Sequence, residues 1–483
     1  MSPTATDRAV PASTHRAVTF EKMFRPVVAA VLVSVFLVDL YAALEWRSLF
    51  ADGVNFFLNV LENNGFFFIE PARRTVHVLQ ELPTVAALRM GVSSVGTLAF
   101  VYGFTLQMLP LALIAACYPL LPRHDKPLFI FPLANFLLGS MPAAYVPIVG
   151  GPVAAGYFWL LLFLVLFGRR RGVVATCIIL AVGAAALHET MVLLMPILAV
   201  AAMLRSRSET STAPRKLFVA LAVWFAAITI VPAWFIINPT VPEQRHDVLM
   251  TAFELFGIGG PNGINVPAVM AVAAVAAMIL IVCWPGRRGQ IGWLTVLLVG
   301  AFCAILDILT LNDGEGSRLF LPVLQFAARN LAVMDAAPLA VLFLWVHRRP
   351  ALREQWMQPP VAALVLVLAL GQIGWQALGV VYWDRFVATF ETILTANVGF
   401  VPWRQALASM TPRQRRGTDR LSWGWTNGQV SIVLAPEGRV STIIGVSDED
   451  HWQPFDPIRP DQLPVAPQFN YARYLRALGT TAR

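Results

Sequence analysis

The amino-acid sequence predicts an all-α polytopic membrane protein with about eleven transmembrane helices and a small C-terminal α/β or β domain outside the membrane. Composition is the first reason, because the chain of 483 residues is 57% hydrophobic and only 13% charged. A soluble domain usually carries about 25% charged residues. Length is the second reason, because apolar runs of about 20 residues recur along the chain and suffice to cross the hydrocarbon core as helices.

The apolar runs divide the chain into three parts. Residues 1–25 form a polar, basic tail, residues 26–381 hold the transmembrane domain, and residues 382–483 are no longer membrane-like. The first run is too long for the core of a signal peptide and has no clear cleavage site after it, so we expect a retained signal anchor. The expected spans lie approximately at 26–44, 97–121, 128–148, 152–168, 172–187, 189–204, 217–237, 265–284, 291–310, 332–346 and 361–381.

Alternate loops between these runs are short and basic, and they predict the topology. Loops rich in Lys and Arg stay in the cytoplasm, so the N-terminus is expected inside and, with an odd number of spans, the C-terminus outside. The plasma (inner) membrane is the expected location. The same loops account for the net charge of +8, so no nucleic-acid partner is predicted. They are the N-terminal tail, 123–126, 169–171, 205–216, 287–288 and 347–353.

The other loops are longer and hold acidic, glycine and aromatic residues. They comprise 45–95, the tip at 188–189, 238–264, 311–331 and the tail from 382. Long loops on a rigid scaffold are where functional sites usually lie. The extracytoplasmic face is therefore the candidate functional face.

The first outer loop, 45–95, predicts two amphipathic helices that lie in the membrane interface. Val54, Phe57, Leu58 and Leu61 follow helical spacing, and Asn63-Asn64-Gly65 ends that helix. Pro71 begins the second helix, with apolar positions 75, 78, 79 and 82 on one face. Its other face carries Arg73, Arg74, His77 and Glu81. The basic cluster of Arg73, Arg74 and His77 is suited to a lipid diphosphate or anionic headgroups; plain surface anchoring is the alternative.

Asp52 is the candidate catalytic residue. It lies at the junction between the first span and the first interfacial helix, at the boundary of water and lipid. Partial desolvation there would raise the pKa of a carboxylate and suit it to general-base catalysis. The alternative is an N-cap, since an aspartate before a helix satisfies free backbone N–H groups.

His188-Glu189 is the second candidate. It lies between two runs of only about 16 residues each, so the turn is expected below the outer membrane surface. Ionisable groups at such depth usually face a cavity or a partner. An ordinary loop tip is the alternative. The dipeptide lacks the second histidine of a zinc-protease motif, so no such enzyme is predicted.

A third group lies in the loop after the ninth expected span. Asp313 and Glu315 alternate with glycines and could hold Mg²⁺ or Mn²⁺ through oxygen atoms, although these ligands are too few for a specific assignment. Arg318 and Arg329 lie outside the basic loops, and arginine makes forked contacts with phosphate. The alternative is that these arginines extend to the membrane interface or form salt bridges with the two acids. All four cysteines fall inside apolar runs, so neither disulfides nor a thiolate metal site is expected.

The tail is expected to fold mostly as strands. Residues 421–434 predict strands around an Asn427-Gly428 turn, followed by a strand over 440–446. Trp423 and Trp425 point to one side of such a strand, where they could stack on a sugar ring or anchor at the membrane. The stretch 454–467 is expected to be irregular and 471–478 a short helix.

This organisation resembles the GT-C superfamily of integral-membrane glycosyltransferases, which use polyprenyl-phosphate sugars as donors. Phe50-Ala51-Asp52-Gly53 and His188-Glu189 carry the resemblance. It covers best the first 200 or so residues, and the rest matches in span count and sidedness. The resemblance implies that Asp52 is the catalytic base. The second outer loop, 149–152, has no acid, and Glu189, which comes later in the chain, is the candidate for the family's second acidic motif.

The resemblance also implies a mechanism. Asp52 would deprotonate an acceptor hydroxyl, which attacks the anomeric carbon of the donor with inversion. Arg318, Arg329 or the pair Arg73 and Arg74 would neutralise the leaving phosphate, while His188 and Glu189 orient donor or acceptor. Whether the acceptor is a glycan, a lipid or a protein stays open.

Two other functions remain open at this point. A lipid or glycolipid transporter or flippase usually places ionisable residues near the bilayer midplane. Here Asp39, Asp307 and Asp335 lie toward the outer ends of their spans, and Gln107 and Asn135 are the main polar residues deeper in. This pattern disfavours ion coupling but permits lipid flipping. A non-catalytic scaffold, or a ligase or polymerase of surface polysaccharide, is the third possibility.

Overall fold

The computed structural model describes residues 12–144, 150–168, 172–238, 288–312, 331–349, 359–397, 399–422, 426–435 and 441–444, with the single positions 272, 273, 276, 278, 279 and 352. The described chain is a bundle of α-helices with one short two-stranded sheet. The α-helices are α1 (Ala12–Leu44), α2 (Asp52–Asn63), α3 (Arg74–Arg89), α4 (Val95–Leu120), α5 (Ile130–Asn135), α6 (Gly151–Phe167), α7 (Val173–Ala185), α8 (Met191–Ser208), α9 (Thr212–Ile228), α10 (Ile230–Ile237), α13 (Arg288–Asn312), α15 (Leu331–His347), α17 (Pro359–Ala396), α18 (Trp403–Ser409), α19 (Pro412–Leu421) and α20 (Asn427–Leu434).

Short helical segments and two strands complete the fold. The strands β1 (Gly399–Pro402) and β2 (Ser441–Ile444) pair in parallel, with Gly399 opposite Ser441. The short segments are the 3₁₀ helices η1 (Arg47–Leu49), η2 (Pro71–Arg73), η3 (Arg123–Phe129) and η5 (Met141–Ala143), and the π-helix η4 (Phe136–Ser140).

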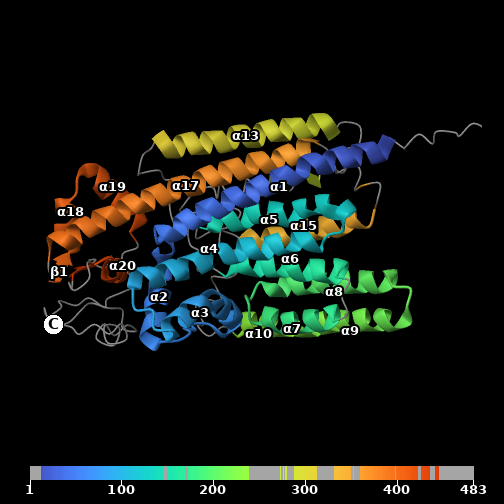
Figure 1. Cartoon of the computed structure of the whole chain (residues 1–483), viewed down its shortest axis with the longest axis horizontal. Helices are drawn as coiled ribbons and strands as arrows, with labels where there is room; N and C mark the ends of the chain where they lie inside the picture. The colour runs from blue at the N-terminus through green and yellow to red at the C-terminus, as the bar shows by residue number, and fades with distance from the viewer. Residues whose placement is uncertain are drawn as a thin grey trace, which may run out of the picture.

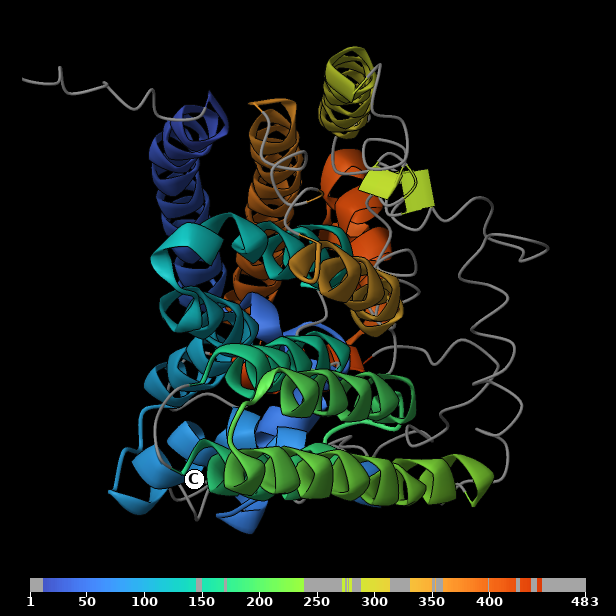
Figure 2. The same ribbon diagram turned by 90° about the vertical axis from the view of Figure 1, so that its right-hand side faces the viewer.

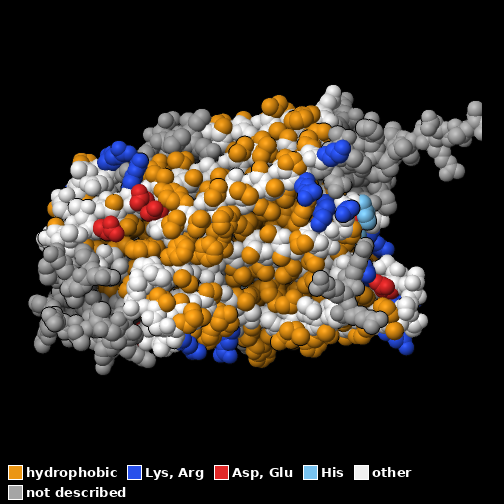
Figure 3. Space-filling model, viewed as in Figure 1, with side chains coloured by type: hydrophobic (Ala, Val, Ile, Leu, Met, Phe, Trp, Pro, Cys, Tyr) orange, Lys and Arg blue, Asp and Glu red, His pale blue; other side chains and the backbone are white. Residues whose placement is uncertain are grey.

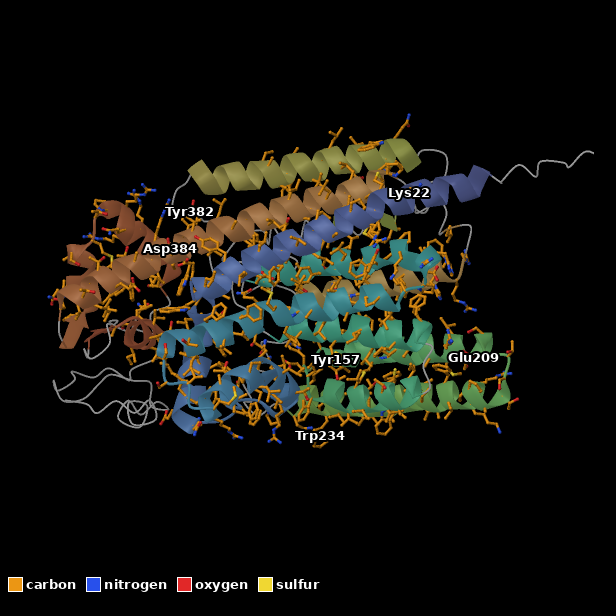
Figure 4. All side chains as sticks on the ribbon, in the orientation of Figure 1. Lys22, Tyr157, Glu209, Trp234, Tyr382 and Asp384 are labelled. Carbon is orange, nitrogen blue, oxygen red and sulfur yellow. The ribbon has the colours of Figure 1, made fainter. Side chains whose placement is uncertain are left out.

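The long helices run side by side, and α13 and the α7–α10 group form opposite edges of the bundle (Figures 1 and 2). Helix α1 packs between α4 and α17, and α13 packs on α17. One end of the bundle carries η1, α2, α3 and the C-terminal part of α17; we call it the η1 end. Lys22 and Glu209 lie at the opposite end, far from Tyr382 and Asp384 (Figure 4).

The structure shows an all-α membrane protein. Hydrophobic side chains cover the middle of the visible face, whereas acidic side chains lie toward the two ends (Figure 3). Five described helices are long and apolar enough to cross a membrane, and each overlaps an expected span. They are Lys22–Leu44, Val95–Leu120, Met191–Ser208, Thr212–Ile237 and Pro359–Ala396.

The four shorter apolar helices of the described chain also overlap expected spans. They are Gly151–Phe167, Val173–Ala185, Gly289–Ile305 and Leu331–His347. The expected span 265–284 falls largely outside the described residues. The total of eleven spans therefore stays a prediction.

The third expected span, 128–148, is not a regular α-helix. Its described part changes from 3₁₀ to α, then to π and back to 3₁₀ geometry. The π segment lies against α15, where a Cβ atom on Gly139 would come within 2.6 Å of the Ala332 Cα. Asn135 donates a 2.8 Å hydrogen bond to the Ala332 carbonyl and accepts one of 2.9 Å from Trp159. Close backbone contact and a buried polar bridge therefore hold this irregular segment.

Both helices expected in the first outer loop are present as α2 and α3, but α3 buries its polar face. His77, Gln80, Glu81 and Thr84 are buried, whereas Leu82 is 51% exposed. A helix whose polar side faces protein and whose apolar side faces outward is the reverse of a soluble amphipathic helix. In a membrane protein this arrangement places the apolar face toward lipid.

The prediction of strands over 421–434 is wrong for the last part of this segment, because Asn427–Leu434 forms helix α20. Every residue of α20 is buried. Two of its polar side chains make hydrogen bonds, one within α20 and one to α2. Ser431 donates to the Asn427 carbonyl at 2.7 Å, and Gln429 donates to Asn55 Oδ1 on α2 at 3.1 Å. Helix α20 packs against β2, α17 and α2, and such contacts between distant segments are not visible in the local sequence pattern.

The strand expected at 440–446 is present in its middle as β2. Its partner is β1, from a segment where no strand was predicted. Helix α17 continues without interruption past residue 382, where the third part of the chain was expected to begin. Trp423, Trp425 and the segments 454–467 and 471–478 lie outside the described residues.

A buried arginine joins three parts of the η1 end. Arg47 in η1 is fully buried and donates from Nη1 to Gln376 Oε1 on α17 at 3.0 Å. Its Nη2 donates to the Ala144 carbonyl, just after η5, at 2.8 Å. Gln376 in turn donates to the Met141 carbonyl at 2.7 Å. Because a charged donor in low dielectric makes strong hydrogen bonds, Arg47 fixes η1 relative to α17 and η5.

The Arg47→Met variant should be strongly destabilised. The substitution keeps an apolar side chain of similar length but leaves Gln376 and the Ala144 carbonyl short of a buried donor, a loss of about 3–5 kcal/mol. Thermal unfolding of the purified protein in detergent measures this, with Arg89→Met, at an exposed position on α3, as the control. Equal melting temperatures for the two variants would contradict the role of Arg47.

Candidate functional site

Asp52 lies on a strained turn that the surrounding structure fixes. Ala51, immediately before it, has φ 51° and ψ −129°, in the region that side chains rarely adopt, and is only 2% exposed. A Cβ atom on Gly53 would lie 1.8 Å from the Ser48 carbonyl oxygen, so only glycine fits there. Backbone strain of this kind costs about 1–3 kcal/mol and clusters at functional sites. The turn therefore sets the position of Asp52 tightly.

The N-cap alternative for Asp52 is not what the structure shows. Ala51 occupies the N-cap position, and Asp52 is the first residue of α2, with its side chain half-buried. A carboxylate in the first turn still interacts favourably with the helix N-terminus.

Arg73 and Glu189 form a two-point ion pair between distant segments. Arg73 Nε donates to Glu189 Oε2 at 3.1 Å, and Arg73 Nη2 pairs with Glu189 Oε1. Glu70 Oε2 also lies 3.4 Å from Arg73 Nε. The pair connects η2, at the start of α3, with the turn between α7 and α8. Two of the predicted site residues are thus in direct contact although 116 positions separate them.

Asp52 lies near enough to Arg73 for the two charges to interact. Burial alone would lower the pKa of Arg73, but Glu189, Glu70 and Asp52 together raise it above its ordinary value. Burial would likewise raise the pKa of Glu189, but His188 and Arg73 hold it well below its usual range. At neutral pH both members of the pair are therefore charged. We call Asp52, Arg73, His188 and Glu189 the Asp52–Glu189 cluster.

His188 is buried in the turn between α7 and α8. Its Nδ1 accepts from the Thr190 backbone N–H at 3.3 Å, and Thr190 Oγ1 is 2.7 Å away. A Cβ atom on Gly150 would lie 3.0 Å from His188 Cδ2, which shows how closely the ring packs against the start of α6. This buried, packed position argues against the alternative of an ordinary loop tip for His188.

His77 and Glu81 form a second, uncharged polar pair behind the cluster. His77 stacks on Phe56 with ring centroids 5.0 Å apart, and its Nδ1 lies 3.6 Å from Glu81 Oε1. Burial, with a smaller effect of Arg73, lowers the pKa of His77 to about 4. Burial raises the pKa of Glu81 to about 8, although the Phe67 N–H donates to its carboxyl at 2.8 Å. At neutral pH the imidazole is neutral and the carboxyl keeps its proton.

Tyr102 on α4 lies within electrostatic range of both polar groups. Its side chain is fully buried, and both Glu81 and Asp52 act electrostatically on its hydroxyl. Within the described part of the chain, that hydroxyl makes no hydrogen bond. Neither Tyr102 nor Glu81 was predicted as a site residue. The helical spacing of Glu81 from His77 was visible in the sequence, whereas Tyr102 lies within an apolar run and gave no signal.

Five further predicted site residues are either outside the cluster or outside the described residues. Arg74 is exposed on α3 next to Arg73. Asp313, Glu315, Arg318 and Arg329 lie outside the described residues, so the Mg²⁺ or Mn²⁺ site stays a prediction. Among the described residues, no group of three or more His, Cys, Asp or Glu has an arrangement that could hold a metal ion.

The cluster combines the groups needed to handle a proton and an anion. Asp52 can accept a proton, while Arg73 offers a planar guanidinium suited to phosphate. In the described structure Glu189 and Glu70 engage its Nε and Nη2, which leaves Nη1 for a further oxygen. The neutral Glu81 carboxyl and the Tyr102 hydroxyl can both donate hydrogen bonds.

The Glu81→Gln variant should change the pH dependence of stability. Glu81 has a folded-state pKa of about 8 and an ordinary value of 4.5, so its contribution to stability falls as pH rises between these values. His77 acts oppositely, but only between about pH 4 and 6.5. Between pH 6.5 and 8 the free energy of unfolding of the wild-type protein should therefore fall by roughly 1–2 kcal/mol because of Glu81. The free energy of unfolding of the variant should not show this fall.

Melting temperatures measured at half-unit pH steps test this difference. Glu209→Gln, a substitution at the opposite end of the bundle, serves as the control and should keep the wild-type slope. Identical slopes for Glu81→Gln and the wild type would show that Glu81 is ionised in the folded protein.

Comparison of the chain with protein-family models, with curated proteins and with solved structures finds no match. Assignment of a function therefore depends on the chemistry of the Asp52–Glu189 cluster.

Proposed function

We propose that this protein is an inverting membrane glycosyltransferase of the GT-C type, which moves a sugar from a polyprenyl-phosphate donor to an acceptor outside the cytoplasm. The proposal is carried by the two-point Arg73–Glu189 pair, together with a carboxylate, Asp52, that follows a strained turn and lies within electrostatic range of Arg73. In this proposal the η1 end faces the extracytoplasmic side of the plasma membrane. The N-terminus is then cytoplasmic.

Asp52 is the general base in this reaction. Its carboxylate takes the proton of the acceptor hydroxyl as that oxygen forms a bond to the anomeric carbon of the sugar. The bond between the anomeric carbon and the phosphate oxygen breaks on the opposite side, and its electron pair leaves with the polyprenyl phosphate. Direct displacement inverts the anomeric centre. The rigid turn at Ala51 and Gly53 supports this role, because a base must be held within hydrogen-bond reach of its proton.

Arginine neutralises the charge that develops on the leaving phosphate. Arg73 Nη1 and the exposed Arg74 are adjacent on the chain and supply donors at the same helix start. Glu189 orients Arg73 by its two-point contact, and His188 holds the turn that presents Glu189. Glu189 is thus assigned to positioning the arginine, a more specific role than direct contact with the donor.

A polar interior behind the cluster supports binding of a hydroxyl-bearing substrate. Glu81 as a neutral acid and Tyr102 are hydrogen-bond donors that lie within electrostatic reach of one another. Sugars are recognised through many such donors and acceptors. A protein that only anchors at the membrane has no need to bury these groups, since each costs free energy unless paired.

The Asp52→Asn variant should lose transfer activity while keeping its fold. Asparagine has nearly the same shape but cannot accept a proton, and a general base contributes about 10²–10⁴ in rate. The assay incubates purified protein with polyprenyl-phosphate sugars and membrane extract as the acceptor source, and follows consumption of the donor. The variant should be slower by at least about a hundredfold at an unchanged melting temperature.

Glu209→Gln is the matched control, since it also converts an acid to its amide but lies at the opposite end of the bundle. It should retain full activity. Donor consumption by Asp52→Asn at the wild-type rate would refute the base assignment. Absence of donor consumption by the wild type, across a panel of sugars, would refute the transferase proposal.

A further inference from the structure

One side of α2 carries a row of asparagines that begins one helical turn after Asp52. Asn55, Asn59 and Asn63 follow Asp52 at steps of three or four residues, so these side chains are neighbours along the helix. Asn59 Nδ2 donates to the Asn55 carbonyl at 2.8 Å, and Asn63 Nδ2 donates to the Asn59 carbonyl at 2.8 Å. We call the three asparagines the α2 amide row. Asn55 is its member beside the candidate base.

The orientation of the Asn55 amide follows from its hydrogen bonds. A backbone carbonyl only accepts, so the Asn59 group that lies 2.8 Å from the Asn55 carbonyl is the NH2 group. The same Asn59 nitrogen also donates to the Asn55 side-chain oxygen, Oδ1, at 3.1 Å. From α20, Gln429 Nε2 donates to that oxygen at 3.1 Å. Asn55 Oδ1 therefore accepts two hydrogen bonds, and the order of oxygen and nitrogen in all three amides follows from one carbonyl.

The NH2 group of Asn55 is a donor with a fixed direction. Within the part of the chain that the structure describes, Asn55 takes part in hydrogen bonds through its side chain only as an acceptor. Rotation of the amide by half a turn would place its NH2 group against two other NH2 groups, so this rotation is disfavoured. The residue is 5% exposed, and a donor in such a place gains free energy from an acceptor. Asn55 is therefore suited to bind a substrate oxygen.

Helix α20 holds this arrangement from a distant part of the chain. It packs against α2, α17 and β2, and it lies beside α2 in Figure 1. Gln429 is 1% exposed, and Ser431 on the same helix accepts the Ile443 backbone N–H of β2 at 3.0 Å. The strand β2 pairs in turn with β1. Gln429 is thus a positioning residue, which acts through Asn55 and does not itself touch a substrate.

A donor one turn away from a general base suits an acceptor with two neighbouring hydroxyl groups. Asp52 needs a hydroxyl that gives up its proton, whereas Asn55 Nδ2 needs a lone pair, which the oxygen of a hydroxyl supplies. A sugar or another polyol carries both groups on adjacent carbons. The side chain of a serine or threonine in a protein acceptor carries a single hydroxyl. The phosphate of the donor is a weaker match, since Arg73 offers it a charged donor.

We propose that Asn55 binds a second hydroxyl of the acceptor, beside the one that Asp52 deprotonates, and that the acceptor is therefore a sugar or another polyol. This inference rests on the proposed transferase function and adds the class of its acceptor. The first hydroxyl gives its proton to Asp52 as its oxygen bonds to the anomeric carbon. The second hydroxyl keeps its proton and accepts from Asn55 Nδ2. Asn59 and Gln429 keep Nδ2 available by holding Asn55 Oδ1.

The role of Asn55 is tested by comparing transfer with hydrolysis of the same donor. In hydrolysis water replaces the acceptor, so this side reaction needs Asp52 but no second hydroxyl. Purified full-length protein is incubated with a polyprenyl-phosphate sugar and membrane extract, and glycosylated product and free sugar are measured separately. Asn55→Ala should lower the ratio of transfer to hydrolysis about tenfold, because the lost hydrogen bond affects transfer alone. Gln429→Met should lower the ratio by a smaller factor, since Asn59 still holds Asn55 Oδ1.

Asn63→Ala is the matched control, because it removes the same amide from the exposed end of the row. It should keep the wild-type ratio. Slowing of both reactions in proportion by Asn55→Ala, or equal ratios for Asn55→Ala and Asn63→Ala, would overturn the role of Asn55. If Asn55→Ala does not fold, as its melting curve shows, an unchanged ratio in Gln429→Met overturns the proposal instead. A wild type that consumes no donor by either route refutes the proposed function, and this inference with it.

Oxidation of the acceptor source with periodate tests the class of the acceptor. Periodate cleaves the bond between adjacent carbons that both carry hydroxyl groups and leaves single hydroxyl groups of proteins intact. Membrane extract treated with periodate should no longer support transfer by the wild type, whereas hydrolysis of the donor should continue. Extract that receives periodate already consumed by excess glycerol is the control and should support full transfer. Equal transfer to treated and control extract would overturn the assignment of a sugar or polyol acceptor.

Discussion

The η1 end of this protein depends on one buried charge. Arg47 makes contacts with a helix more than 300 positions later in the chain and with the segment that follows η5. Removal of a guanidinium from water is costly, and only several good hydrogen bonds offset that cost. Here Gln376, Gln107 and two backbone carbonyls accept them. The position of η1 follows from these contacts, and with it the turn at Ala51 that presents Asp52.

Charge distribution at this end separates two polar environments. The ion pair of Arg73 and Glu189 is charged on both sides, whereas His77 and Glu81, only one or two helical turns away on α3, are both neutral. The first group can meet an anion, and the second can share hydrogen bonds with uncharged hydroxyls. A phosphate-linked sugar presents both kinds of chemistry. This match connects the electrostatics to the proposed transferase function.

The sequence predicted the membrane class and the positions of the main helices because composition and the length of apolar runs report burial in lipid directly. It predicted the α2–α3 pair in the first loop from helical spacing of apolar residues. It also selected Arg73, His188 and Glu189, which the structure brings into contact. Periodicity did not predict that α3 turns its polar face inward, because which face meets protein depends on distant partners. For the same reason α20 was mistaken for a strand: its contacts with Asn55 and β2 are tertiary. Tyr102 gave no signal because an isolated tyrosine in an apolar run is usually core.

The inward polar face of α3 has a consequence for the order of assembly. At the time residues 74–89 leave the ribosome, the turn that binds Arg73 has not been synthesised, and Gln429, which binds Asn55, comes more than 300 residues later. Arg73 therefore lacks its Glu189 contact during early insertion, although Phe56 and Phe67, which contact His77 and Glu81, are already present. The Arg73–Glu189 contact forms only once the turn between α7 and α8 has been made, and the contact of Gln429 with Asn55 only after α20 has been made. A chain that ends before His188 would contain α2 and α3 but neither of the two contacts that tie them to later segments, Arg73 with Glu189 and Asn55 with Gln429.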